Sequence, residues 1–163
     1  MMYEDVIRDF AARTRTNLHA IEQLETAGHD VYEVTQLVNS TLGLLVFPQQ
    51  KYFDQIPETP LADLKRDGWP VPKCLRGPEQ VQNLNQLIRY LRNAIAHFNI
   101  KFIGDGTNQL HLIRVWNENR GTKTWEAELS VTDLRGIAER FVELLLSGDQ
   151  RRDRAAIGPE TST

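Results

Sequence analysis

The sequence feature that most constrains the fold is an apolar stripe in the middle of the chain. Between Val81 and Phe98, apolar side chains return every three or four residues without a gap. This spacing is typical of a helix that buries one face against a core. Pro78 lies just before the stripe, where the first helical turn has no use for a backbone N–H donor. The pattern therefore predicts a long amphipathic helix over residues 79–98.

The same spacing predicts three other long helices. The first covers residues 3–26, where no proline interrupts the pattern. The second begins with Asp30 as its N-cap and stops at Pro48. The last follows Ser130 or Thr132, since either residue suits an N-cap. Helices joined in this way pack antiparallel by default. The predicted fold class is therefore mainly α, an antiparallel up-and-down bundle of about four long helices.

Two stretches between the helices have other patterns. At about residues 99–130, apolar and polar residues alternate around two turns, which predicts a small three-stranded antiparallel β-meander. Residues 48–78 hold most of the prolines and predict a long connection with one short helix at residues 61–66. The predicted helical domain covers residues 1–147. The arginine-containing, apolar-poor tail at residues 148–163 is expected to be disordered.

Composition excludes several classes of protein. The chain has 163 residues and a net charge of −3, which argues against binding nucleic acid over the whole surface but leaves room for a local basic site. The single cysteine, Cys74, excludes an intramolecular disulfide framework and favours a reducing compartment. The first residues do not resemble a signal peptide, and the longest apolar block, residues 42–47, is too short to span a bilayer. A cytoplasmic protein without membrane contact is expected.

One segment reverses the acidic balance of the chain. Residues 80–104 contain no Asp or Glu but contain three basic residues, Arg89, Arg92 and Lys101. On a helical wheel with Arg92 at zero, the apolar stripe centres near about 270° and His97 falls at about 140°. Arg92 and His97 therefore flank a polar wedge that faces away from the core. A solvated helix face without any chemistry would explain the same residues.

The residues of this wedge suit the cleavage of RNA. His97 could take the proton of a 2′-hydroxyl or protonate the leaving oxygen, and Arg92 could hold the charge that develops on the phosphate. Asn93 lies one turn below His97, close enough to orient the imidazole. Arg89 inside the wedge and Tyr90 beside it are the candidate substrate-binding residues, although Tyr90 also suits a dimer contact. No metal or cofactor is expected, because the other histidines show no ligand spacing with His97.

Residues 91–97, Leu-Arg-Asn-Ala-Ile-Ala-His, resemble the signature of the HEPN superfamily, the higher eukaryote and prokaryote nucleotide-binding domains. That signature is an Arg, a polar residue directly after it and a His a few residues further on. Arg92, Asn93 and His97 fill these positions. Three further runs resemble a bacterial group of HEPN family nucleases: residues 34–40, 46–48 and 125–129. The resemblance covers residues 3–147.

The resemblance implies properties that composition does not show. HEPN proteins of this kind are helical bundles that form homodimers, in which the Arg and His of both motifs meet in one composite, metal-independent endoribonuclease site. Their products carry a 2′,3′-cyclic phosphate and a 5′-hydroxyl. Many act in toxin–antitoxin or phage-defence systems, which implies RNA as substrate and an antitoxin or defence-system partner.

One departure and two alternatives accompany these expectations. Some relatives carry a Tyr two residues after the His, where this chain has Asn99, so control by modification of that Tyr is not expected. Other superfamily members bind nucleotide or a partner protein without cleaving RNA. The alternative functions are therefore a non-catalytic binding module and a purely structural dimer.

Overall fold

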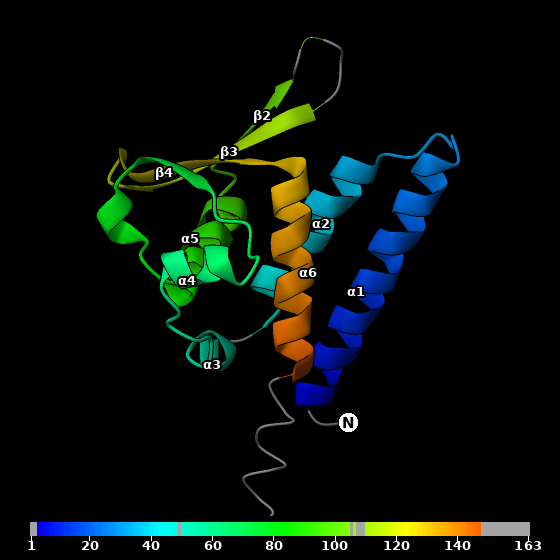
Figure 1. The fold of residues 1–163 in the computed structure, drawn as a ribbon, viewed down its shortest axis with the longest axis horizontal. Helices are drawn as coiled ribbons and strands as arrows, with labels where there is room; N and C mark the ends of the chain where they lie inside the picture. Colours follow the sequence, from blue (N-terminus) through cyan, green and yellow to red (C-terminus); the bar gives the residue numbers. More distant parts are fainter. Residues whose placement is uncertain (1–2, 49, 105, 107–109, 148–163) are drawn as a thin grey trace, which may run out of the picture.

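The computed structural model describes residues 3–48, 50–104, 106 and 110–147. Within these residues, the helices form one layer, and an antiparallel β-sheet lies across one end of it (Figure 1). None of the described helices is both long enough and apolar enough to cross a membrane. The predicted tail, residues 148–163, lies outside the described part of the chain.

Helices occupy the stretches in which the sequence predicts them. α1 (Tyr3–Thr26) contacts α2 (Glu33–Val46) and α6 (Val131–Ser147) and runs antiparallel to both (Figure 1). α5 (Leu84–Ala96) contacts α2. Leucine, isoleucine and alanine side chains from these four helices meet in one continuous core.

Two of the helices, α5 and α6, begin at a side-chain cap, whereas α2 does not. α6 begins as predicted at Ser130, because the Asp133 N–H donates to the Ser130 hydroxyl at 3.0 Å and the Ser130 N–H donates back to the Asp133 carboxylate at 3.0 Å. α5 begins at Leu84, later than predicted, because Asn83 caps it by accepting from the Gln86 N–H at 2.9 Å. Pro78, Glu79 and Gln80 before it form a short 3-10 helix, Pro78–Gln80. α2 likewise starts after Tyr32 rather than at Asp30, without a side-chain cap.

The sheet is larger than the predicted meander. β2 (Ile100–Gly104), β3 (Leu110–Asn119) and β4 (Thr122–Ser130) confirm the three predicted strands. A fourth strand, β1 (Lys73–Arg76), pairs antiparallel with β4, so the strand order is β1-β4-β3-β2.

The predicted long connection therefore holds more structure than expected. Its short helix is present as α4 (Leu61–Arg66), but α3 (Gln50–Phe53) and β1 were not predicted. β1 shows no apolar alternation, since all four of its residues are exposed at the edge of the sheet. Its place is set by backbone pairing with β4, in which Lys73 lies opposite Glu128 and Arg76 lies opposite Glu126.

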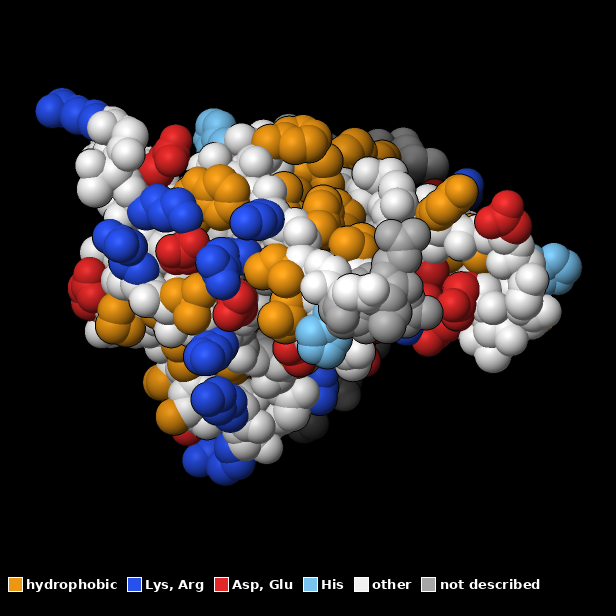
Figure 2. Space-filling view, turned by 90° about the horizontal axis from the view of Figure 1, so that it is seen from above, with side chains coloured by type: hydrophobic (Ala, Val, Ile, Leu, Met, Phe, Trp, Pro, Cys, Tyr) orange, Lys and Arg blue, Asp and Glu red, His pale blue; other side chains and the backbone are white. Residues whose placement is uncertain are grey.

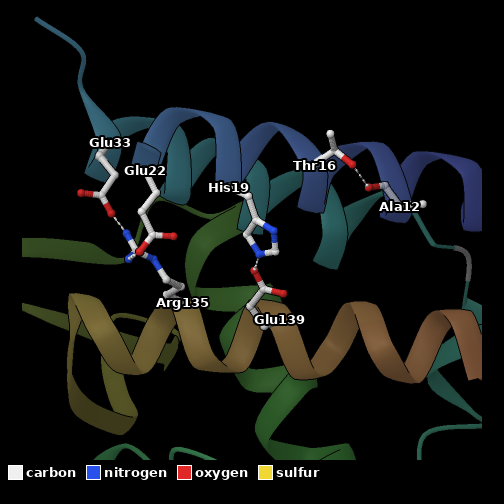
Figure 3. A network of polar contacts seen from close by, with 7 residues as sticks. All are labelled: Ala12, Thr16, His19, Glu22, Glu33, Arg135 and Glu139. Carbon is white, nitrogen blue, oxygen red and sulfur yellow. Dashed lines mark hydrogen bonds and ion pairs between the residues drawn. The ribbon is translucent and has the colours of Figure 1, made fainter. Parts of the chain in front are cut away.

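Polar contacts tie the outer helix α1 to α6 (Figure 3). Arg135 on α6 forms ion pairs with Glu22 on α1 and with Glu33 in the first turn of α2. One turn further along α6, the Glu139 carboxylate accepts a hydrogen bond from Nε2 of His19 at 2.7 Å. These partly exposed pairs contribute little energy each, but together they fix the register of three helices around the core.

Replacing Gly77 with alanine is expected to lower the free energy of unfolding by about 2–4 kcal/mol. The backbone there has a φ of 65°, which costs a side-chain-bearing residue about 1–2 kcal/mol, and an added Cβ would overlap the carbonyl oxygen of Thr124 on β4. Gly121→Ala is the matched control, since its φ is 78° but nothing lies within 4 Å of an added Cβ. Urea denaturation measures both variants, and equal losses would contradict the steric argument.

Candidate active site

His97 lies at the C-terminal end of α5, where the helix ends in a left-handed residue. His97 is the C-cap, and its backbone N–H donates to the Asn93 carbonyl at 3.0 Å. The Phe98 N–H then donates to the Ile95 carbonyl at 3.1 Å, and the Asn99 N–H to the Ala94 carbonyl at 2.8 Å. This pair of bonds is a Schellman motif. It requires a positive φ at Phe98, which is 58°, although glycine is the usual residue at this position.

The Schellman motif leaves His97 and Phe98 exposed at the end of the helix. The Phe98 side chain is 80% exposed, and that of His97 is exposed as well. Asn93 is also exposed, but its side chain makes no hydrogen bond to His97 within the described residues. The contact between the two residues is the backbone bond alone. Orientation of the imidazole by the Asn93 amide therefore stays a prediction.

Arg92 is held near the opposite end of the wedge by an aromatic ring. Its guanidinium Cζ lies 4.6 Å from the centroid of Phe53 on α3, which is a cation–π distance. Phe53 is fully buried, so the ring is a fixed support. The sequence analysis missed Phe53, because it lies in the proline-rich connection, where no periodic pattern marks it as part of a site.

Within one protomer, Arg92 and His97 do not converge. Five residues of α-helix separate them by a rise of about 7.5 Å and by about 140° around the axis. No hydrogen bond joins the two side chains within the described part of the chain. The helix geometry therefore directs the two side chains to different sides of α5.

The two predicted substrate-binding residues have partners within the protomer. Arg89 donates from Nε to Asn85 at 2.7 Å and pairs through Nη2 with Asp54 at 2.7 Å. The Tyr90 hydroxyl donates to Gln80 at 3.0 Å, and its ring packs edge-on against Trp125 with centroids 5.5 Å apart. Contact of either residue with a substrate stays a prediction.

An apolar groove opens beside Phe98. It encloses about 310 Å³ between α2, the end of α5, β2 and β3. Figure 2 shows hydrophobic side chains reaching the surface near the middle of the view. The groove is lined by Val34, Thr35, Val38, Asn39, Leu42, Ile95, Phe98, Ile100, Phe102 and Leu110. The exposed apolar surface of the protomer therefore continues directly from the residue that follows His97.

The described residues hold no group of three or more His, Cys, Asp or Glu side chains placed to bind one metal ion. Cys74 is exposed, and its thiol donates to the Arg76 carbonyl at 3.2 Å.

Comparison with known proteins gives the family. Residues 1–152 match the family described as HEPN pEK499 p136. The chain therefore belongs to this HEPN family, as the resemblance of its Arg92–His97 segment predicts. No curated protein and no solved structure matches the chain.

Proposed function

We propose that this HEPN protein is a metal-independent endoribonuclease that works as a homodimer in the cytoplasm. The observation that carries the proposal is the exposed Arg–polar–His segment at the end of α5 in a chain of this family. His97 is the general acid or base, and Arg92 stabilises the charge of the transition state.

The substrate supplies its own nucleophile in this reaction. The 2′-oxygen of the ribose attacks the adjacent phosphorus, the bond to the 5′-oxygen breaks, and the products are a 2′,3′-cyclic phosphate and a 5′-hydroxyl. One proton leaves the 2′-hydroxyl and one reaches the 5′-oxygen, and an imidazole can carry either at neutral pH. The guanidinium of Arg92 binds the non-bridging oxygens, whose negative charge grows as the attack proceeds.

The geometry supports a site shared between two copies of the chain. Since Arg92 and His97 leave α5 about 140° apart, a second copy is needed to bring a guanidinium to the imidazole at the exposed end of the helix. The 80% exposed Phe98 ring and the groove beside it give this end an apolar surface suited to such a contact.

Mixed dimers test the proposal. Arg92→Ala and His97→Ala homodimers are each expected to cleave RNA at least about 10²-fold more slowly than the unchanged protein. A dimer that combines one chain of each kind keeps one Arg92 and one His97 on different chains, so its rate is expected to exceed both homodimers by at least about tenfold. Differently tagged chains are co-expressed and purified in tandem, and labelled RNA is cleaved in EDTA.

Several results would contradict this proposal. Mixed dimers as slow as the homodimers would place Arg92 and His97 of one chain in the same site. A monomer by light scattering at tens of micromolar would remove the shared site, and cleavage that needs added magnesium would remove the metal-independent reaction. Absence of any cleavage by the unchanged dimer would favour a module that binds nucleotide or a protein partner.

The family also supports a role in a toxin–antitoxin or phage-defence system, with an antitoxin or defence protein as the partner. In such a system the ribonuclease arrests growth when it is released, and the arrest depends on the same two side chains.

A further inference from the structure

The outer face of the sheet is an open surface with its own pattern of side chains. Along β3 and β4, buried residues such as Val115 and Ala127 point toward the helices and alternate with Arg114, Trp116 and Glu128 on the other face. Figure 1 shows α4, α5 and α6 on one side of the sheet and no described element over the other. The described part of the chain therefore leaves this face of the sheet uncovered.

Cations outnumber carboxylates on this face of an acidic protein. Strand pairing places Lys101, Arg114, Glu128 and Lys73 in one row across the sheet. Figure 2 looks onto this end and shows Lys and Arg side chains gathered over the sheet, with few Asp and Glu between them. The cations of the face are Lys73, Arg76, Lys101, Arg114 and Lys123, and the carboxylates are Glu118, Glu126 and Glu128.

Three of these cations are exposed and make no ion pair within the described residues: Lys73, Arg76 and Lys101. Only the other two are neutralised within the face, since Arg114 pairs with Glu128 at 2.7 Å and Lys123 with Glu126 at 2.7 Å. The free cations therefore leave the face attractive to an anion.

Arg114 adds a hydrogen-bond donor without an acceptor. Its Nη2 donates to Glu128, and this hydrogen bond raises the pKa of the guanidinium. Its Nε is buried and has no hydrogen-bond partner within the described residues. A buried donor without a partner is costly, and Arg114 lies next to Lys101 across the strands.

Trp116 gives the same face an aromatic surface. The Lys123 ammonium lies 4.6 Å from the centroid of its ring, and the indole stands on the outer side of β3, in the row that also holds Glu126 and Arg76. Cations that track a phosphate chain, combined with an aromatic ring on which a base can stack, are the features by which proteins bind single-stranded nucleic acid. Duplexes keep their bases stacked inside and cannot use such a ring.

The outer face of the sheet, called the platform below, is joined to the candidate active site through the backbone. The Trp116 N–H donates to the carbonyl oxygen of Asn99 at 3.1 Å, and Asn99 follows His97 by two residues. We propose that the outer sheet face, built on Trp116, Arg114 and the free cations Lys73, Arg76 and Lys101, binds single-stranded RNA and presents it to His97. This proposal rests on the proposed ribonuclease function, to which it adds the form of the substrate and its docking surface.

Binding is tested in the full chain with His97→Ala, so that the probe is not cut. The probe is a labelled single-stranded oligoribonucleotide of mixed sequence, and its affinity is measured over a range of salt. Lys73→Gln, Arg76→Gln and Lys101→Gln together are expected to weaken binding at least tenfold and to reduce the log–log salt slope by about two, since single strands give a slope of about 0.7 per neutralised phosphate. The matched control changes the same number of charges elsewhere, at Arg13, Arg15 and Lys65.

Trp116 provides an independent test with a different signature. Trp116→Ala is expected to weaken binding by about 5- to 150-fold, the usual range for one stacked base, without a change of salt slope, because no charge is removed. Trp116→Leu keeps an apolar side chain against the sheet and lacks the stacking surface. It is expected to lose the same affinity while retaining the thermal midpoint of the unchanged protein.

The outcomes separate this proposal from the proposed function. Unchanged affinity in the triple variant, or an equal loss in the control, overturns the platform even if the protein cuts RNA. If both proposals hold, the triple variant should lose less activity on a dinucleotide, which is too short to span the face, than on a long single strand. If the unchanged protein binds single strands but cuts nothing, and the triple variant loses this binding, the RNA-binding face stands and the ribonuclease function is wrong. Equal binding of duplex RNA or of anionic lipid vesicles at the same residues overturns the single-strand specificity.

Discussion

Replacing His97 with alanine is expected to slow RNA cleavage by about 10²–10⁴-fold, the usual contribution of a general acid or base. The fold should survive, because the helix cap at this position is made by the His97 backbone and the side chain is exposed. Single-turnover cleavage of labelled RNA measures the effect on the chemical step. His29→Ala is the control, since His29 is an exposed residue in the turn between α1 and α2.

A loss of less than about tenfold would contradict the role of His97 as acid or base. A large loss accompanied by a lower thermal midpoint would instead mean that the substitution disrupts the end of α5. The thermal midpoint is therefore measured on the same samples. The His29 control should cleave at the rate of the unchanged protein.

Replacing the ribose at the cleaved position with deoxyribose is expected to abolish cutting. The proposed attacking 2′-oxygen is then missing, whereas the phosphate that Arg92 is proposed to bind is unchanged, so affinity should stay within about twofold. The experiment compares a labelled RNA with its single-deoxy analogue and determines the chemistry of the new ends. Cutting of the analogue at an undiminished rate, or products ending in 5′-phosphate, would mean that water or hydroxide attacks and that the roles of Arg92 and His97 are wrong.

Helical periodicity predicted the helices because they bury one face along their whole length. The stripe from Leu84 to Ile95 is buried against α2 and β3. Its apolar residues recur at helical spacing, so the sequence of this one segment is enough to predict the buried face. Helix starts were less well predicted, because they depend on one side chain. Asn83 rather than the proline five residues earlier begins α5, since the Asn83 side-chain oxygen Oδ1 accepts from the Gln86 N–H and caps the helix.

β1 could not be predicted from its own residues. A four-residue edge strand with every side chain exposed has no apolar alternation, and its position is set by pairing with β4, some fifty residues later in the sequence. The sequence does hold complementary charges on the two strands, but nothing in a single chain tells which distant segments meet.

The candidate site was predicted as positions on a helix and not as contacts. The wheel placed Arg92 and His97 on the polar side of α5, where both are found. It did not show that Arg92 lies over Phe53, that Tyr90 packs on Trp125, or that the helix ends in a left-handed Phe98. Each of these depends on a residue outside the helical repeat.

The left-handed Phe98 has a consequence for motion. A residue with a side chain in this region raises the energy of the closed helix end by about 1–2 kcal/mol, and its ring, 80% exposed, recovers little through burial in the protomer. Local unfolding of the last turn of α5 releases that energy. The free energy needed to open this turn is therefore lower, by the same amount, than at an unstrained helix end. The bond from Trp116 to Asn99 secures the chain just beyond. The imidazole of His97 therefore lies on a short segment that can change its backbone angles between two fixed elements, α5 and β3, while the rest of the core stays packed.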